Sequence, residues 1–231
     1  NPDNYGLDRI DQRALPLNAR YNYPDQAGEG VHLYILDSGI NKNHTEFAGH
    51  IGGGLSFVTG TAPADWGDCH GHGTHVAGTA AGTKYGVAKK ATLHSLRVAD
   101  CNGSASSSDM LAAMDWLARS PNAPRPAVAN MSVGTVGGRS AQLEAGARAV
   151  VNANIAFAVS AGNENIPACD RSPSAEAAVL SVGATDKTDA RAYYSNYGAC
   201  IDLFAPGTDI FSAYHADNTS GVYNTGTSMA S

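Results

Sequence analysis

Three short stretches of the sequence carry side chains that together could perform nucleophilic catalysis. Ser228 stands in Gly-Thr-Ser-Met-Ala-Ser, His72 stands in His-Gly-His-Gly-Thr-His, and Asp37 follows the apolar run Val-His-Leu-Tyr-Ile-Leu. A serine hydroxyl is too weakly acidic to attack an amide unaided, so it needs a base within hydrogen-bond reach. We interpret His72 as that base, and Asp37 as the carboxylate that accepts a hydrogen bond from its other ring nitrogen.

The surrounding pattern predicts strands that alternate with helices. Short apolar runs are typical of parallel strands that are buried on both faces, and they occur at residues 31–36, 92–98, 127–133, 155–161 and 179–184. Amphipathic spacing predicts helices over 109–119 and 140–152, and a further helix opens at His72. This order predicts an α/β fold with a doubly wound, mostly parallel sheet and helices on both faces. The glycine runs 52–54 and 137–138 are predicted to be loops.

Such a sheet would bring the chemical residues together. Right-handed crossovers place the carboxyl ends of all strands along one edge, where ligands of open α/β sheets bind. Asp37, the segment 132–134 and Asn163 all fall just past predicted strand ends. We therefore expect the site at that edge.

The order Asp37, His72, Ser228 is that of the subtilisins, and the three motifs resemble those of subtilisin-like serine proteases, closest to the secreted, proteinase K-like branch. The resemblance runs from about Tyr5 to Ser231. It implies one peptidase domain over residues 1–231, without the part that follows the nucleophile in the family. It also implies a secreted serine endopeptidase that cleaves peptide bonds through an acyl-enzyme intermediate.

The resemblance assigns further roles near the same edge. Asn163 would donate its side-chain amide to the developing oxyanion, together with the backbone N–H of Ser228. Gly103 and the backbone of 132–134 would pair with an extended peptide, which gives broad specificity. The walls of the primary pocket would be small, neutral residues, namely Ser132, Val133, Gly134, Ser160, Ala161 and Gly162. Since those walls hold no carboxylate, a basic side chain would be buried unpaired, and apolar or aromatic residues before the cut are favoured.

The four cysteines allow three pairings. Cys69 and Cys101 flank motifs that must lie close together, and so do Cys169 and Cys200, so we predict these two bridges and an oxidising compartment. Four free buried thiols are the alternative. A metal cluster is disfavoured because no Cys-x-x-Cys spacing occurs.

Oxygen donors cluster in the polar N-terminal segment, at Asp8, Asp11, Gln12 and Asn18. Calcium prefers such ligands, and the resemblance implies calcium binding there. It also implies a second calcium site, made by the carboxylate of Asp202 and the carbonyls of Ala177 and Val179. The alternatives are a solvated surface segment for the first set and a capped loop carboxylate for Asp202.

Composition narrows the range of partners. The 231 residues include 15 Lys and Arg against 21 Asp and Glu, and the net charge of -6 argues against nucleic-acid or anionic-membrane partners. The sequence contains no run of about 18 apolar residues, which is the length that a membrane-spanning helix needs. The expected partners are protein or peptide substrates, together with two that the resemblance implies: the remaining C-terminal segment and an inhibitory propeptide.

Two interpretations of other classes compete with a protease. The first is a truncated or nicked fragment that binds substrate or calcium without turnover. The second is a zinc cluster of His70, His72 and His75, because His-x-His-x-x-His can ligate a metal. That spacing lacks the acid expected of a metallohydrolase, and it would leave Asp37 and Ser228 without a function.

Overall fold

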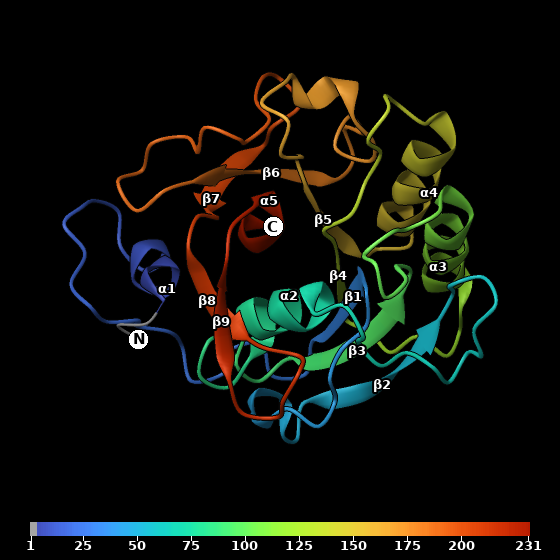
Figure 1. Ribbon diagram of the computed structural model, residues 1–231, viewed down its shortest axis with the longest axis horizontal. Helices are drawn as coiled ribbons and strands as arrows, with labels where there is room; N and C mark the ends of the chain where they lie inside the picture. The colour runs from blue at the N-terminus through green and yellow to red at the C-terminus, as the bar shows by residue number, and fades with distance from the viewer. Residues whose placement is uncertain (1–3) are drawn as a thin grey trace.

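The main sheet has seven strands, and every neighbouring pair in it is parallel. The computed structural model describes residues 4–231 (Figure 1). The strand order is β2-β3-β1-β4-β5-β6-β7, and a separate antiparallel hairpin pairs β8 with β9. The strands are β1 His32–Asp37, β2 Ile51–Ser56, β3 Thr92–Arg97, β4 Ala127–Met131, β5 Ala156–Ser160, β6 Leu180–Thr185, β7 Leu203–Pro206, β8 Ile210–Ala213 and β9 Gly221–Asn224.

Helices cover both faces of this sheet, so the predicted α/β class is confirmed. Helices α3 and α4 pack side by side on one face, while α2 and α5 lie on the other (Figure 1). The α-helices are α1 Tyr5–Ile10, α2 His72–Ala81, α3 Ser107–Arg119, α4 Ala141–Asn152 and α5 Thr227–Ala230, and the short 3-10 helices are Thr45–Phe47 and Ala168–Asp170. Among residues 4–231, no helix has the length and apolar character needed to cross a bilayer.

Strand β1 shows why its sequence is an almost unbroken apolar run. Tyr34 and Leu36 belong to the hydrophobic core under α3 and α4, whereas Leu33 and Ile35 belong to the core under α2 and α5. Successive side chains of a strand point to opposite faces, so a strand at the centre of a two-sided sheet needs apolar residues at every position. The strand that ends at Asp37 is therefore held rigidly from both sides.

The crossovers on either side of β3 have opposite hands. The β2-α2-β3 and β3-α3-β4 connections both run in the same direction across the sheet, yet α2 and α3 lie on opposite faces. The expectation of right-handed crossovers throughout is thus wrong for one of them. Because α2 shares a face with α5, and the two helices are in contact, His72 and Ser228 both come from first turns of helices on one side of the sheet.

The glycine run 52–54 is an edge strand, β2, and its assignment as a loop was wrong. A Cβ on Gly52 would overlap the ring of His94, and a Cβ on Gly54 would lie 2.6 Å from Cδ2 of Trp66. Glycine in a strand commonly marks such a close approach. Rings from elsewhere in the chain, which local sequence does not reveal, take the space that side chains normally fill.

Both predicted disulfides are present in the structure: Cys69 is bonded to Cys101, and Cys169 to Cys200. No cysteine in the described chain is free. The first bridge ties the segment before α2 to the turn after β3. The second ties the loop after β5 to the segment before β7.

Candidate active site

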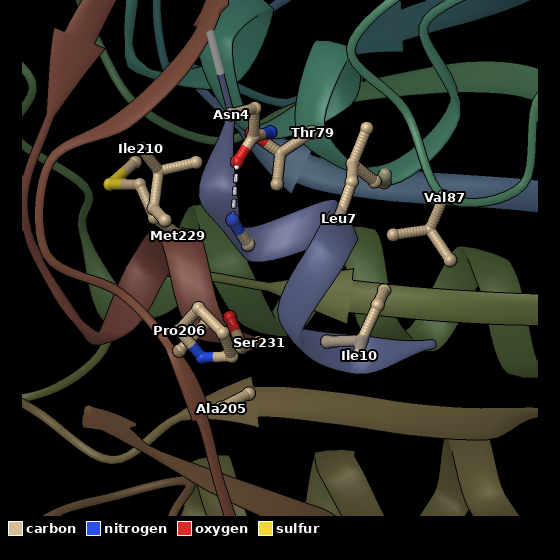
Figure 2. A pocket seen from close by; sticks show the side chains of 13 residues that line it. Asn4, Leu7, Ile10, Thr79, Val87, Ala205, Pro206, Ile210, Met229 and Ser231 are labelled. Carbon is tan, nitrogen blue, oxygen red and sulfur yellow. Dashed lines mark hydrogen bonds between the residues drawn. The ribbon is translucent and has the colours of Figure 1, made fainter. Parts of the chain in front are cut away.

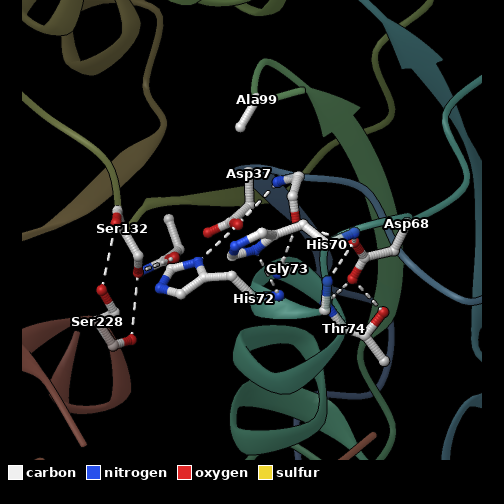
Figure 3. A network of polar contacts seen from close by, with 12 residues as sticks. Asp37, Asp68, His70, His72, Gly73, Thr74, Ala99, Ser132 and Ser228 are labelled. Atoms are coloured by element: carbon white, nitrogen blue, oxygen red, sulfur yellow. Dashed lines mark hydrogen bonds and ion pairs between the residues drawn. The ribbon is translucent and has the colours of Figure 1, made fainter. Parts of the chain in front are cut away.

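Asp37 ends the central strand and is buried, with 1% of its surface exposed. Its Oδ1 lies 2.7 Å from Nδ1 of His72 and accepts a second hydrogen bond, of 2.7 Å, from the backbone N–H of Ser38 (Figure 3). Its Oδ2 is buried and has no hydrogen-bond partner in the described structure. A buried carboxylate is costly unless it is paired, so this group favours a positive charge on the imidazole beside it.

His72 begins α2, and its electrostatic surroundings favour its protonated form. Burial alone would lower the pKa of His72, but the charge of Asp37 and the hydrogen bond to it, together with the charge of Asp68, raise that pKa above its usual value. The ring therefore accepts a proton more readily than a free histidine does.

Ser228 is the second residue of α5 and is 7% exposed. Its Oγ donates a hydrogen bond of 3.2 Å to the carbonyl of Ser132. In the described structure it makes no hydrogen bond to His72. Ser228, His72 and Asn163 nevertheless line one cleft of about 400 Å³. Catalytic hydrogen bonds are often long or poorly aligned until substrate binds, so the lack of this one does not exclude His72 as the base.

Asn163 lies just past β5, and its amide orientation is fixed by α5. Its Oδ1 accepts hydrogen bonds from the backbone N–H of Thr227, at 2.8 Å, and from the hydroxyl of Thr227, at 3.0 Å. Since the oxygen is occupied, Nδ2 is the atom that can serve a ligand in the cleft. A preorganised amide donor beside a nucleophile is suited to an oxyanion.

Asp68, which the sequence analysis did not single out, clamps the start of α2 to the end of β1. Its Oδ1 accepts from the hydroxyl of Ser38 at 2.9 Å and from Gly71 N–H at 2.8 Å, and its Oδ2 accepts from Thr74 N–H at 2.9 Å. Burial opposes ionisation, but these and further hydrogen bonds lower the pKa of Asp68, with the Thr74 side chain the largest contributor. Its position shortly before a helix that opens with Gly-His is the signal that could have found it.

The predicted pocket walls meet in a second cavity of about 110 Å³ that Ser228 and Asn163 also line. Five of the six predicted residues line it, namely Ser132, Gly134, Ser160, Ala161 and Gly162. Val133 instead packs against the core under α3 and α4. Gly103 is in a turn against His70 and lines neither this cavity nor the cleft.

The same cavity is lined by Glu164 and Arg171, which the sequence analysis did not include. The predicted walls hold no carboxylate, but the cavity that they form does, because Glu164 also lines it. Glu164 could have been noticed because it follows Asn163 directly. Arg171 enters from the loop after β5, which folds back over the pocket, and no local sequence pattern indicates this.

The histidines of the zinc interpretation do not converge. His75 is fully buried and its Nε2 lies 3.0 Å from the carbonyl of Ile210 and 3.1 Å from that of Val222, which ties α2 to the β8–β9 hairpin. Burial lowers the pKa of His75 to about 4 despite these two hydrogen bonds, so the ring is neutral and structural. The described residues contain no group of three or more His, Cys, Asp or Glu side chains arranged to hold a metal ion.

Three of the four N-terminal oxygen donors are linked by hydrogen bonds, which Asn18 makes to Asp8 and to Gln12. Asp8 Oδ1 accepts from Asn18 N–H at 3.1 Å, and Gln12 Oε1 accepts from the Asn18 side chain at 2.9 Å. Asp11 Oδ2 accepts from the Asn22 side chain at 2.8 Å, while its Oδ1 is buried without a hydrogen-bond partner. Two carboxylates, one of which has a buried oxygen without a partner, and a carboxamide oxygen are a donor set that fits a hard cation.

The second calcium set is less enclosed. Asp202 is exposed, and its Oδ2 accepts a hydrogen bond of 2.8 Å from the backbone N–H of Ser181, two residues after Val179. The carboxylate thus lies beside the segment that contains the Ala177 and Val179 carbonyls. Its oxygen chemistry fits calcium as well.

Comparisons with known proteins give this geometry a family. The model of the Subtilase family matches residues 28–231. The chain is 51% identical over 230 residues to an extracellular serine proteinase of Thermus sp. (strain Rt41A), covering 100% of this chain and 54% of that protein. It is 45% identical over 230 residues to proteinase T of Parengyodontium album, covering 98% of this chain and 76% of that protein.

The fold agrees as closely. A crystal structure of a cold adapted subtilisin-like serine proteinase matches with a TM-score of 0.93 at 43% identity, covering 100% of this chain and 81% of that one. Measured against several curated relatives, the chain spans about half of their length, 54%, 41% and 56% in three cases. Since the family model covers nearly all of the sequence, the chain belongs to the subtilase family.

Proposed function

We propose that the protein is a secreted serine endopeptidase in which Asp37, His72 and Ser228 form the catalytic triad. The observation that carries this proposal is the 2.7 Å contact between Asp37 and His72 at the head of a cleft that Ser228 and Asn163 also line. The family membership supports it, because the relatives are named serine proteinases.

In the proposed reaction, Ser228 Oγ attacks the carbonyl carbon of the scissile peptide while His72 Nε2 takes its proton. Asp37 stabilises the resulting imidazolium without taking that proton. The amide of Asn163 and the backbone N–H of Ser228 stabilise the oxyanion of the tetrahedral intermediate. His72 then protonates the leaving amine, and water hydrolyses the remaining acyl-enzyme by the same steps in reverse order.

Substrate contacts are proposed on the same basis. The cavity walls Ser132, Gly134 and 160–162, with Val133 behind them, would hold the side chain before the cut (P1), with apolar and aromatic residues preferred. Gly103 and the backbone of 132–134 would pair with the extended peptide by strand addition, which tolerates many sequences. Secretion is supported by the two disulfides and by the relative named an extracellular proteinase.

A serine-directed phosphonylating reagent tests the function directly. We expect the full-length protein to hydrolyse an unfolded protein substrate, and the reagent to abolish turnover by adding one phosphonyl group to Ser228, located by peptide mass spectrometry. The competing interpretation, a fragment that binds without turnover, predicts neither hydrolysis nor labelling at Ser228.

The pH dependence of kcat/KM should have an acid limb set by His72. The base must be neutral to accept the proton of Ser228, and its pKa is raised. Turnover should therefore fall as the pH drops through a midpoint above the usual histidine value of about 6.5. Asp68→Asn should move that midpoint to lower pH, because the charge of Asp68 raises the pKa of His72. A wild-type midpoint well below about 6.5 would contradict this assignment.

We also propose structural calcium, held by Asp8, Asp11, Gln12 and Asn18 at one site and by Asp202 with the Ala177 and Val179 carbonyls at another. Calcium would neutralise the carboxylates, and it would be coordinated by the buried Oδ1 of Asp11, which has no hydrogen-bond partner in the described structure.

Removal of calcium should lower the thermal unfolding temperature. A ligand that binds only the native state stabilises it by about 2.7 kcal/mol at a hundredfold excess over its Kd, so excess EDTA should remove a stabilisation of this order per site. Calcium, but not magnesium, should restore it. Asp11→Asn should reduce the loss on chelation, and an unchanged unfolding temperature in EDTA would count against both sites.

Two polypeptide partners complete the proposal, alongside a single peptidase domain over residues 1–231. An inhibitory propeptide would occupy the cleft. A C-terminal segment would cover a mostly apolar cavity of about 240 Å³ that α1, α2, β8 and α5 surround (Figure 2). Leu7, Ile10, Val87 and Met229 point into this cavity, which supports an apolar occupant.

A further inference from the structure

Two charged side chains in the pocket for the P1 residue have no role in the mechanism above. Among residues 4–231, Glu164 and Arg171 are the only charged residues that line this cavity of about 110 Å³, and Ser228 lines it with them. Nε of Arg171 lies 3.8 Å from Oε2 of Glu164. The distance is too long for a hydrogen bond, so the two groups compensate each other's charge without satisfying each other's hydrogen bonding.

The carboxylate is held in place rather than free to swing into solvent. Oε2 of Glu164 accepts a hydrogen bond of 2.8 Å from Nδ2 of Asn196, and the backbone N–H of Glu164 donates to Oδ1 of Asn196 at 3.1 Å. Asn196 is fully buried and also donates to the carbonyl of Ala161. A Cβ on Gly162 would lie 2.7 Å from Oε2 of Glu164, so this glycine leaves the room that the carboxylate uses.

The guanidinium is enclosed more deeply than its partner. The side chain of Arg171 is 17% exposed against 37% for Glu164. Its Nη1 donates to the carbonyl of Asp170 at 3.1 Å, but its Nε is buried and has no hydrogen-bond partner in the described structure. A buried N–H without an acceptor is costly. Because Arg171 lines the cavity together with Glu164, its charge acts on any side chain that enters there.

We propose that Arg171 is a specificity-determining residue whose charge cancels that of Glu164 and so keeps the P1 pocket neutral. The proposal rests on the peptidase function proposed above and replaces the reason first given for apolar selectivity. A pocket with Glu164 alone would attract basic side chains. With Arg171 beside it, a lysine ammonium gains one attraction and suffers one repulsion, and still loses its hydration, so neutral side chains are favoured.

The test compares kcat/KM on peptides that differ only at P1, with Phe, Lys or Glu there. Arg171→Met should raise the Lys-to-Phe ratio at least about tenfold and lower the Glu-to-Phe ratio. An unpaired protein charge about 4 Å from the charge of the P1 side chain contributes more than the free energy of a tenfold change. Glu164→Gln should change both ratios in the opposite direction, because it leaves the positive charge of Arg171 unpaired. Glutamine is chosen because its side-chain oxygen can still accept the hydrogen bond from Asn196. The double variant should return close to the wild-type ratios.

Arg119→Met is the matched control, because it removes the same charge from an exposed pair with Asp115, in which the arginine side chain is 80% exposed. It should leave every ratio unchanged. Unaltered ratios in Arg171→Met that still cleaves the Phe peptide would overturn the proposal. If that variant fails to fold, unaltered ratios in Glu164→Gln would do so. Wild-type protein that cleaves none of the peptides would instead refute the peptidase function itself.

Discussion

Replacement of Ser228 by alanine is expected to lower kcat by about 10⁶-fold, the loss measured when the nucleophile of a subtilisin is removed. The oxygen of this hydroxyl is the only protein atom in the proposed mechanism that forms a covalent bond to the substrate. KM should change little, because that oxygen makes a single hydrogen bond of 3.2 Å to the Ser132 carbonyl in the described structure, and Asn163 is held by Thr227 instead. The measurement is steady-state hydrolysis of a Phe peptide, with burst kinetics to detect the acyl-enzyme in the wild type.

Ser108→Ala provides the matched control for that experiment. This serine is exposed on α3, and its hydroxyl contacts only Ser106 in the described structure. Its activity should equal that of the wild type. Ser228→Ala protein that kept more than about a thousandth of the wild-type rate, well above the residual rate expected without a nucleophile, would rule out the assigned nucleophile.

Replacement of Asp37 by asparagine should lower kcat by about 10⁴-fold, a figure taken from the equivalent change in trypsin. The asparagine amide would donate to Nδ1 of His72 where the carboxylate now accepts at 2.7 Å. The ring would then carry its proton on Nε2, so the nitrogen that faces the cleft could not take the proton of Ser228. The loss should appear in kcat, measured with the same peptide at several pH values.

Asp65→Asn removes an equal charge from an exposed loop and should be without effect. The unfolding temperature of Asp37→Asn should stay near that of the wild type, which checks that the variant is folded. Phosphonylation of Ser228 should become slow, because His72 no longer activates it. Activity within about tenfold of the wild type, a loss far short of that for the wrong tautomer, would show that Asp37 does not set the tautomer of His72.

Local sequence pattern was sufficient to predict strands that are covered on both faces and helices that are covered on one. The run that ends at Asp37 is apolar at every position because both faces of β1 are covered, and this is visible in the sequence. The amphipathic helices α3 and α4 likewise expose one face to solvent. Strand β1 ends at Asp37 and strand β5 ends shortly before Asn163, so the same pattern predicted which edge of the sheet carries both residues.

The sequence failed where distant residues decide the local structure. In strand β2, the rings of His94 and Trp66 occupy the space beside Gly52 and Gly54, and Gly53 has a φ of 128°, whereas a glycine run otherwise predicts a loop. Arg171 lines the 110 Å³ cavity from the long connection between β5 and β6. Asp68 acts through hydrogen bonds to two segments, the end of β1 and the start of α2. None of these relations has a signature in local spacing.

The strand order also has a kinetic consequence. The central strand β1 is the first of the sheet to be synthesised, yet His32 pairs with Thr92 on one side and with Ala127 on the other. Large loops must close, at an entropic cost, before any of those contacts repays it. Chains dominated by such distant pairings cross their folding barrier slowly. A template that held β2 and β3 in register before β4 arrived would shorten that search, and we expect spontaneous refolding without one to be slow.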